Sequence, residues 1–361
     1  MSGLQKTYNV LGIMSGTSFD GLDLAFCTFY LDNSEWTFQI RIAETISYSK
    51  KWVDTLKSAE TADSNHKAIS ESFGSYIGKA VNSFMKKHAI LDLDLISSHG
   101  HTLFHDPAKK ISFQAGEGQS IFNETKVTVV SNFRQQDIQL GGQGAPLVPI
   151  GDLFLFKNQP VCINLGGFAN ISIKIGTEIK AWDICPVNYV LNHLTRSIGF
   201  DYDDKGKIAA SNKVNGSLLR QLNALSYYDK QPPKSLSREW VYAKVWPIID
   251  SVNYSSSIKI ATITEHAAIQ IAKAIPSNTN ALFTGGGTFN DHLISRIKHH
   301  CNAVQIDIPN RKIIEYKEAL IFGFLGVLRI RGEINILSAV TGASKNHSSG
   351  DIIARGDIIA R

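Results

Sequence analysis

Two stretches of this chain share one layout, in which an apolar run reaches a glycine turn and a second apolar run leaves it. The first stretch covers residues 8–30 and turns at MSGTS, and the second covers 160–175 and turns at Gly166-Gly167. Short apolar runs on either side of a glycine-rich turn are typical of β-hairpins. A hairpin that occurs twice predicts a chain built as two similar halves.

The remaining periodicity mixes strands with helices. Phe38–Ser47 alternates between apolar and polar residues, which indicates a strand. His66–Lys87 carries apolar residues at steps of three and four, which indicates a helix with one buried face. Ala281–Thr284 runs into a third glycine turn, and a last helical pattern covers residues 315–331. We therefore expect an α/β fold in which helices are layered on sheets.

The length suggests two domains. At about 150 residues per domain, a chain of 361 residues would hold two. We place the first lobe at 1–130, with 326–345 as a candidate addition to it, and the second lobe at 131–325. The sequence GDIIAR occurs twice in succession near the C-terminus. We expect residues 346–361, which contain this repeat, to form a flexible tail.

Charge and hydropathy exclude several classes of protein. The net charge is +5 without a clustered basic stripe, so we expect no nucleic-acid partner. The longest apolar stretch, Ala319–Leu328, is shorter than the roughly 18 residues that span a membrane. The four cysteines lie far apart, and the N-terminus lacks a secretory pattern. Together these features predict a cytoplasmic protein with reduced thiols and no membrane contact.

The three glycine turns are candidate phosphate-binding sites. They lie at Gly16, at 166–167 and at 285–287, each after an apolar strand. Glycine leaves room for backbone amides to approach a phosphate, and successive amides can bind an anion. A single turn of this kind is more often a simple tight turn. The chain has neither G-x-x-x-x-G-K-[ST] nor G-x-G-x-x-G spacing, which disfavours the nucleotide folds that carry those loops.

The first turn also carries side chains suited to a nucleotide. Ser15, Thr17 and Ser18 add hydroxyl donors. Asp20 and Asp23 could hold the waters of a hydrated Mg²⁺. Three such turns in one chain, two of them in matched hairpins, favour nucleotide binding.

Seven strings along the chain stand in the order found in one protein family. They are GIMSGTSFDGLD (12–23), SHGHT (98–102), NFRQQDIQLGGQGAPLVP (132–149), NLGGFANIS (164–172), PPKSLSREW (232–240), TGGGTFN (284–290) and VTGA (340–343). With them the chain resembles the anhydro-N-acetylmuramic acid kinase family over residues 8–343. MSGTSFDG and GGQGAPLVP are long enough to make a chance match a poor explanation.

This resemblance implies a fold, a reaction and a set of ligands. The fold is that of the actin, hexokinase and heat-shock-ATPase superfamily, whose two similar ribonuclease H-like lobes close over ATP in an interlobe cleft. Members use Mg-ATP and water to open the anhydro bridge of 1,6-anhydro-N-acetylmuramic acid. The product is N-acetylmuramate 6-phosphate, an intermediate in the recycling of cell-wall sugars. We therefore expect ATP, Mg²⁺ and an anhydro amino sugar as ligands, and a homodimer.

The family's ATP-binding motif falls on the first turn and its flanks. Its second phosphate turn and its adenosine-side turn fall on the other two. The residues assigned to ATP are Gly16, Thr17, Ser18, Phe19, Asp20, Gly21, Leu22, Asp23, Gly166, Gly167, Gly285, Gly286 and Gly287.

The family's catalytic carboxylate lies in a D-T-G-P-G-N string, and the matching stretch here is DICPVN, residues 183–188. Asp183 and Asn188 remain, while both glycines are replaced. Because Val187 stands where a glycine would, we expect it to exclude a left-handed backbone and to add bulk beside the site. The resemblance implies that Asp183 is the general base that activates water. It also implies that Glu318 assists near the same place.

A further group of side chains is expected to contact the sugar. The residues assigned to it are His99, Arg134, Asp137 and Asn188. Arg134 could pair with a phosphate or with the lactyl carboxylate in a bidentate contact. Asn132 stands where the family has an aspartate, so one charge is missing. The turn 141–144 is expected to shape the sugar pocket.

Two other functions stay open at this point. His99 and His101, followed by His105 and Asp106, could bind a metal ion in a metal-dependent hydrolase, and stoichiometric zinc would favour that function. The altered turn at 183–188 could instead mark a non-catalytic ATP- and sugar-binding homologue. Binding of ATP without release of ADP would favour the homologue.

Overall fold

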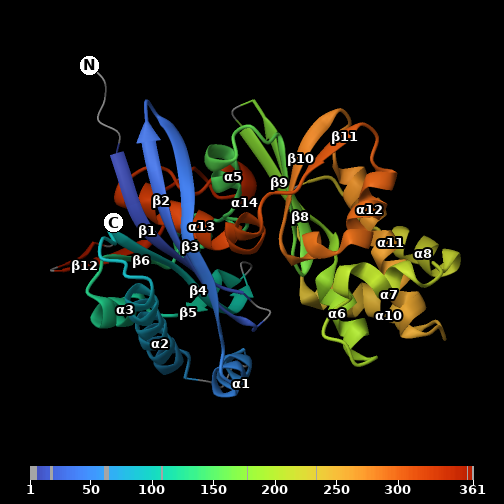
Figure 1. Cartoon of the computed structure of the whole chain (residues 1–361), viewed down its shortest axis with the longest axis horizontal. Coiled ribbons are helices and arrows are strands. Elements are labelled where there is room, and N and C mark those ends of the chain that lie inside the picture. Colours follow the sequence, from blue (N-terminus) through green and yellow to red (C-terminus); the bar gives the residue numbers. More distant parts are fainter. Residues whose placement is uncertain are drawn as a thin grey trace. The chain divides into compact units, whose positions relative to one another are not determined.

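The chain forms two compact units. The computed structural model describes residues 6–16, 19–60, 65–106, 109–176, 178–232, 234–355 and 357–359. The first unit comprises Met1–Phe156 together with Tyr316–Arg361, and the second comprises Lys157–Glu315. The chain crosses into the second unit after α5 and returns within helix α13 (Figure 1). These limits differ from the expected ones, because residues 131–156 and 316–325 belong to the first unit.

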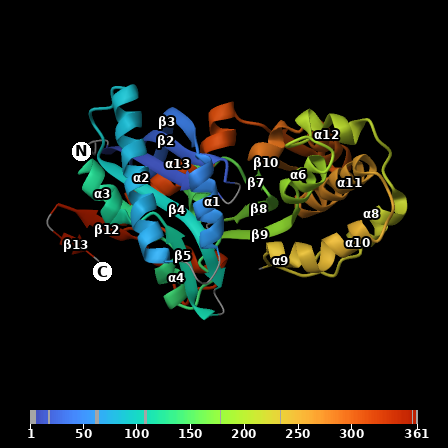
Figure 2. The same cartoon turned by 90° about the horizontal axis from the view of Figure 1, so that it is seen from below.

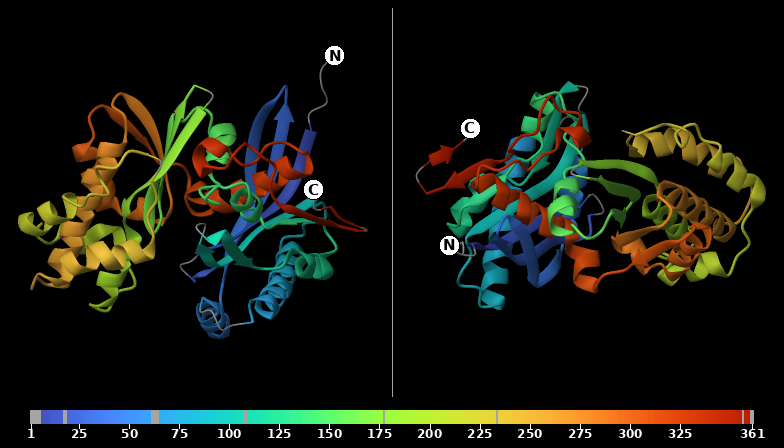
Figure 3. Two further views of the ribbon diagram at one scale, coloured as in Figure 1. Left: turned by 180° about the vertical axis from the view of Figure 1, so that it is seen from behind. Right: turned by 90° about the horizontal axis from the view of Figure 1, so that it is seen from above.

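The first unit is built on a sheet of eight strands in the order β13-β12-β6-β4-β1-β2-β3, with β5 paired to β4. Strands β1 to β3 form an antiparallel meander, visible as the blue strands of Figure 3, and β4 runs parallel to β1. The strands are β1 (Lys6–Ser15), β2 (Gly21–Asp32), β3 (Glu35–Ser47), β4 (Leu95–Asp106), β5 (Ile111–Ala115), β6 (Val129–Ser131), β12 (Asp351–Ala354) and β13 (Asp357–Ile359).

Helices cover both faces of this sheet. They are α1 (Lys50–Ala59), α2 (His66–Lys87), α3 (Gly118–Thr125), α4 (Gln135–Gln139), α5 (Pro149–Leu155), α13 (Arg311–Ile330) and α14 (Ser338–Thr341). Helix α2 lies across one face (Figure 2), where Phe73 and Ile77 share a core with Leu11 and Ile13 of β1. The other face of β1 meets α13 at Gly12, where an added Cβ would overlap the carbonyl oxygen of Ala319. Because successive residues of a strand face opposite sides, β1 carries large apolar residues towards α2 and a glycine towards α13.

The second unit repeats the same topology on a sheet of five strands. Its order is β11-β10-β7-β8-β9, with β7 to β9 an antiparallel meander and β10 parallel to β7. The strands are β7 (Val161–Leu165), β8 (Phe168–Ile175), β9 (Glu178–Pro186), β10 (Thr279–Thr284) and β11 (Val304–Asp307). The order β11-β10-β7-β8-β9 matches β6-β4-β1-β2-β3 of the first unit, so the predicted pair of similar α/β halves is confirmed.

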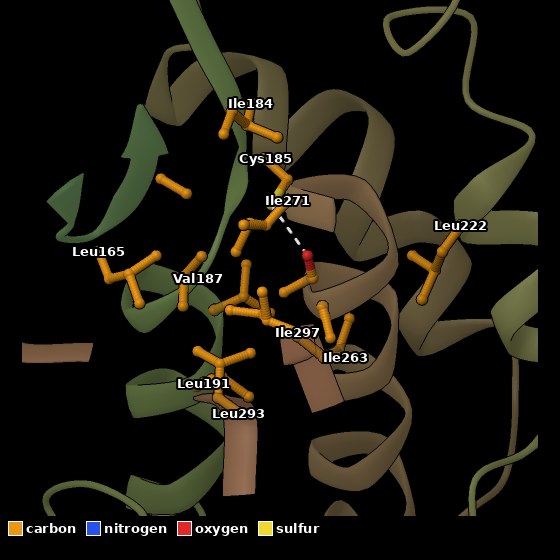
Figure 4. Close-up of a cluster of buried hydrophobic side chains, with 14 of the residues drawn as sticks. Leu165, Ile184, Cys185, Val187, Leu191, Leu222, Ile263, Ile271, Leu293 and Ile297 are labelled. Atoms are coloured by element: carbon orange, nitrogen blue, oxygen red, sulfur yellow. Dashed lines mark hydrogen bonds between the residues drawn. The ribbon is translucent and has the colours of Figure 1, made fainter. Parts of the chain in front are cut away.

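Helices of the second unit enclose a separate core. They are α6 (Asn188–Arg196), α7 (Lys207–Ala210), α8 (Gly216–Asn223), α9 (Arg238–Trp240), α10 (Trp246–Asp250), α11 (Ser256–Ala274) and α12 (Asp291–His300), with short non-α turns at Asp204–Gly206, Val241–Val245 and Gly286–Phe289. Figure 4 shows Leu165, Val187 and Leu191 within this cluster, and Cys185 Sγ donating to the carbonyl of Ala267 on α11.

The described part of the C-terminal repeat forms strands, in contrast to the expected flexible tail. The first copy supplies β12, which pairs antiparallel with β6, and Ile353 is buried in the core of the first unit. The second copy supplies β13, which pairs with β12. Gly356 and residues 360–361 lie outside the described part of the chain. The adjacent isoleucines, which suit a sheet, explain why this segment forms strands.

None of the helices that the structure describes is long and apolar enough to cross a membrane.

The contact between β1 and α13 generates a test of packing. Gly12→Ala should lower the free energy of unfolding by roughly 1–3 kcal/mol or more, because the new methyl group overlaps backbone that cannot move independently of the helix. Gly323→Ala, on the facing side of α13, is the matched control. Its added Cβ would lie 3.5 Å from the Cα of Gly12, an ordinary contact, and alanine favours a helix by about 1 kcal/mol. Urea unfolding of both variants measures the difference, and equal stabilities would contradict the proposed overlap.

Candidate active site

The first glycine turn is anchored by a buried hydrogen-bond network. Ser15 Oγ, at the end of β1, lies 2.6 Å from the Tyr48 hydroxyl and 2.7 Å from His101 Nδ1. All three side chains are buried. The Ser15 hydroxyl is therefore engaged inside the protein, which contradicts its expected role as a phosphate donor. Its place instead fixes the end of β1, from which the turn starts.

The other residues of the predicted ATP motif differ in accessibility. Thr17 and Ser18 lie outside the described residues. The side chain of Leu22 is fully buried, and a Cβ added at Gly21 would collide with β3. Neither residue therefore presents a side chain to a ligand. The motif residues that remain at least partly exposed are Gly16, Phe19, Asp20 and Asp23.

The two acids of the turn differ in their surroundings. Asp20 is exposed, whereas Asp23 Oδ1 accepts a hydrogen bond of 2.6 Å from the Thr45 hydroxyl. Within the described ranges, no group of three or more histidine, cysteine or acidic side chains is arranged to hold a metal ion directly. Two carboxylates suit a magnesium ion that keeps most of its waters.

Arg134 is held by two protein acceptors. Its Nε donates to His99 Nε2 at 2.9 Å, and its Nη1 donates to the Gly144 carbonyl at 2.6 Å. Since Nε2 accepts this bond, His99 carries its proton on Nδ1, which lies 2.9 Å from the Gly100 carbonyl. Burial and the charge of Arg134 lower the pKa of His99 well below its ordinary value, so the imidazole is neutral. His99 therefore orients Arg134, a role that the sequence did not suggest.

These contacts leave the histidine pair badly placed for a metal ion. His99 Nε2 faces the guanidinium of Arg134, and His101 Nδ1 faces Ser15. His105 Nδ1 lies 2.8 Å from the Ser112 hydroxyl. A metal ion would have to displace these partners, so the hydrolase alternative loses its structural basis.

Two acidic groups lie near Arg134 in the first unit. Burial raises the pKa of Glu318, an effect that the charges of Arg134 and Lys317 oppose. Burial also lowers the pKa of Arg134 to about 10, with Glu318 and Asp137 acting against it. Lys317 itself forms a buried ion pair of 2.6 Å with Asp152. Arg134 and Glu318 are thus close enough for the charge of each to influence the pKa of the other.

Asp137 does not face a ligand. It is fully buried, and its Oδ2 accepts a bond of 2.7 Å from the Gly144 amide. Its Oδ1 accepts a bond of 2.7 Å from the Thr341 hydroxyl and lies 3.5 Å from His347 Nε2. This placement contradicts the predicted sugar contact. Asp137 instead fixes the 141–144 turn, whose Gly144 carbonyl receives Arg134.

In the second unit the remaining glycine turns lie against each other. Cβ atoms at Gly285 and Gly287 would both collide with Leu165, which immediately precedes Gly166. Gly285 also has φ +83°, in the left-handed region that favours glycine. The sequence prediction that these turns serve one ligand is compatible with this adjacency. An open pocket follows the 285–287 turn and is lined by Thr288, Asp291, Ile294, Ser295, Lys298 and Ile308.

Asn188 begins helix α6 and supports the same turns. Its side-chain Nδ2 donates to the Leu165 carbonyl at 3.2 Å, and its main-chain N–H donates to the Gly166 carbonyl at 3.3 Å. The amide of Val187 donates to the Gly167 carbonyl at 2.8 Å. The structure therefore places Asn188 as a brace of the glycine turn, and its predicted sugar contact stays a prediction.

Val187 does not adopt the left-handed backbone conformation that favours glycine. Its φ is −128°, so the position does not need a glycine. Its side chain is fully buried in the core of the second unit (Figure 4) and does not add bulk at the surface of the turn. The backbone is therefore not left-handed, as expected for a valine, whereas the expectation of added bulk beside the site is wrong.

Asp183 lies on β9 with its carboxylate largely enclosed. Its Oδ2 accepts a bond of 2.9 Å from the Leu236 amide. Burial raises the pKa of Asp183 to about 6, against the lowering effect of this hydrogen bond. A carboxylate with such a pKa is ionised at neutral pH and still basic enough to accept a proton. The string PPKSLSREW marked the partner segment, but its sequence gave no sign that it binds Asp183.

Comparisons with known proteins agree with the motifs. The model of the anhydro-N-acetylmuramic acid kinase family matches residues 8–355. The anhydro-N-acetylmuramic acid kinase of Synechococcus elongatus is 30% identical over 96% of this chain and 99% of its own length. That of Mannheimia succiniciproducens is 30% identical over 98% and 100%. Component A of Acidaminococcus fermentans (R)-2-hydroxyglutaryl-CoA dehydratase is a similar solved structure, with a TM-score of 0.47 and 12% identity over 88% of this chain and 97% of that one. The resemblance inferred from the seven strings is confirmed.

The Asp137 network generates a test. Thr341→Val removes the hydroxyl that donates to Asp137 and leaves a buried carboxylate oxygen short of a donor, so we expect stability to fall by roughly 1–3 kcal/mol. Thr264→Val is the matched control. Thr264 is also fully buried, and its hydroxyl has no hydrogen-bond partner among the described residues. The control should therefore be neutral or stabilising in urea unfolding, and equal losses in both variants would contradict the network.

Proposed function

The chain belongs to the anhydro-N-acetylmuramic acid kinase family, and on that premise we propose how its own residues carry out the family's reaction. The chain phosphorylates 1,6-anhydro-N-acetylmuramic acid with ATP while water opens the anhydro bridge. The product is N-acetylmuramate 6-phosphate, which returns cell-wall sugar to metabolism. The observation that carries the assignment of roles is the enclosed Asp183 carboxylate, whose pKa of about 6 suits a base at neutral pH.

Asp183 takes a proton from the attacking water. The water oxygen forms a bond to the anomeric carbon, and the bond from that carbon to the bridging oxygen breaks. The freed oxygen on the sixth carbon takes the γ-phosphoryl group, and ADP leaves. The proton on Asp183 is afterwards released to solvent, so that the sugar gains one water and one phosphoryl group in total.

The glycine turns bind the phosphates of ATP. Gly16 and its neighbours, the 166–167 turn and the 285–287 turn offer backbone amides to the negative charge. The pocket beside the 285–287 turn, lined by Ile294 and Ile308 among others, suits the nucleoside. Magnesium supplies charge neutralisation at the transferring phosphoryl group. Asp20 and Asp23 would hold the waters of this magnesium ion.

Arg134 and Glu318 serve the sugar side. The guanidinium of Arg134, already oriented by His99 and Gly144, pairs with the lactyl carboxylate or with the phosphoryl group. The charge of Glu318 acts to raise the pKa of Arg134, so the two side chains lie near each other. Glu318 therefore acts near the anionic group of the sugar or phosphate that Arg134 binds. A homodimer and a cytoplasmic location complete the proposal.

The non-catalytic alternative rested on the altered 183–188 turn. Val187 adopts φ −128° and points into the core, while the Asp183 carboxylate is retained and accepts a hydrogen bond from the Leu236 amide. These observations favour a working enzyme over a homologue that only binds.

The proposed reaction makes a product of defined mass. Incubation with Mg-ATP and 1,6-anhydro-N-acetylmuramic acid should release ADP and give a sugar heavier by one water and one phosphoryl group, as measured by mass spectrometry. Asp183→Asn should abolish this product because an amide cannot take the proton. The variant should also be at least as stable as the parent at about pH 8, because a raised folded-state pKa means that the ionised carboxylate lowers stability above about pH 6. A sugar heavier by phosphate alone would exclude a water-activating base.

The pKa of Asp183 predicts the acid side of the pH profile. The turnover number should fall about tenfold per pH unit below a midpoint near 6, because protonation removes the base. The measurement is the initial rate of ADP release at saturating substrates between about pH 5 and pH 9. A midpoint at about 4, where an ordinary aspartate titrates, would contradict the enclosed environment.

A further inference from the structure

The main chain of strand β9 is irregular at Asp183. In the pairing of β8 with β9, Asn170 lies opposite Asp183 and Ala169 lies opposite Cys185. Ile184 is thus the additional residue of a β-bulge. Bulges re-aim side chains and interrupt the hydrogen-bond ladder, so a backbone group beside a bulge can need partners from elsewhere.

One connecting segment supplies these partners. The Tyr227 hydroxyl donates to the Asp183 carbonyl at 2.6 Å. The Asp183 amide donates to the Lys234 carbonyl at 3.2 Å, and the Leu236 amide donates to Asp183 Oδ2 at 2.9 Å. The segment therefore binds the main-chain acceptor, the main-chain donor and one carboxylate oxygen of a single residue.

Tyr227 is itself held in place. Its ring is buried and lies 5.2 Å from the ring of Trp240. Lys234 Nζ lies 4.8 Å from the centre of the Tyr227 ring and donates to the Tyr227 carbonyl at 3.2 Å. The ring that carries the hydroxyl is thus contacted by both Trp240 and Lys234, and a rigid donor positions its acceptor better than a mobile one.

We propose that Tyr227 and the backbone of residues 234–236 form a positioning clamp that aims the Asp183 carboxylate at the attacking water. The proposal rests on the proposed function of Asp183 as the base. The clamp occupies Oδ2 through Leu236, which leaves Oδ1 to receive the proton. Tyr227 is a positioning residue, because it contacts the backbone of the base and no reacting atom.

The neighbouring titratable groups do not share the proton at neutral pH. Burial raises the pKa of the Cys185 thiol and of the Tyr227 hydroxyl far above neutrality. From α11, His266 is buried, with a pKa lowered to about 3, and is therefore neutral. The ammonium of Lys234 faces Tyr227. The Leu236 amide is consequently the main group that favours the ionised form of Asp183, and loosening it should raise the pKa of Asp183.

Tyr227→Phe keeps the ring and removes only the hydroxyl. We expect kcat to fall about tenfold, because a displaced base loses much of its effect. The acid limb of the pH profile should also move to higher pH, while the KM for ATP stays unchanged. Tyr228→Phe is the matched control, since its hydroxyl lies 2.8 Å from His266 Nε2 and does not contact Asp183. The control should retain the parent kcat and acid limb.

A second pair of variants tests the Leu236 amide. Leu236→Pro removes the N–H that donates to Oδ2, whereas Leu236→Ala keeps it. The proline variant should move the acid limb upward, and the alanine variant should not. Circular dichroism and urea unfolding select the variants that fold.

A titration without substrate separates this proposal from the proposed function. Carboxyl NMR of the full chain reports the pKa of Asp183 directly, and it should rise in Tyr227→Phe and in Leu236→Pro. If the parent releases no ADP with the sugar, the proposed function fails while the titration still tests the clamp. If folded Tyr227→Phe and Leu236→Pro both keep the parent pKa and acid limb, the clamp is overturned even in an active enzyme.

Discussion

The first unit depends on the close approach of α13 to β1 at Gly12. The helix can lie there only because the strand presents no side chain, so that the carbonyl of Ala319 occupies the place of a Cβ. Glu318 directly precedes Ala319, and Ser15 lies three residues after Gly12 on the same strand. The contact therefore fixes the position of α13, which carries Glu318, relative to β1, which leads into the first glycine turn. A larger residue at position 12 would disturb both elements at once.

The second unit also contains a close backbone approach that depends on glycine, but its glycines lie in a turn and not in a strand. Here the 285–287 turn approaches the end of β7, and it is Leu165 that would collide with a side chain on Gly285 or Gly287. Asn188 adds hydrogen bonds to the same strand end. The two units thus share strand order but differ in where backbone meets backbone. Each arrangement leaves a turn whose neighbouring elements are rigid, which is what a phosphate site needs if its amides are to be oriented before the ligand arrives.

The local pattern of the sequence was sufficient to predict the hairpins, because a hairpin forms between apolar runs that are neighbours in the chain on either side of a glycine turn. It was not sufficient for Asp137 or Ser15, whose burial depends on partners as distant as Thr341 and His101. The lobe limits differed for the same reason, since the 131–156 segment and the C-terminal strands contact elements far away in the sequence. The side chain of Val187 was expected beside the site because the sequence does not show that it points into the core of the second unit.

The surroundings of Asp183 balance two opposing requirements on a base. Burial alone would raise its pKa until the carboxylate remained protonated at neutral pH and could accept nothing. Several hydrogen-bond donors would instead stabilise the anion so well that it lost its basicity. The structure combines strong enclosure with a backbone donor, the Leu236 amide, and the resulting pKa of about 6 lies between these limits. Tyr227 adds no donor to the carboxylate, because its hydroxyl binds the carbonyl of Asp183. Orientation and basicity therefore depend on different atoms of the same segment, and loosening the segment at Tyr227 should also weaken the bond from the Leu236 amide and raise the pKa of Asp183.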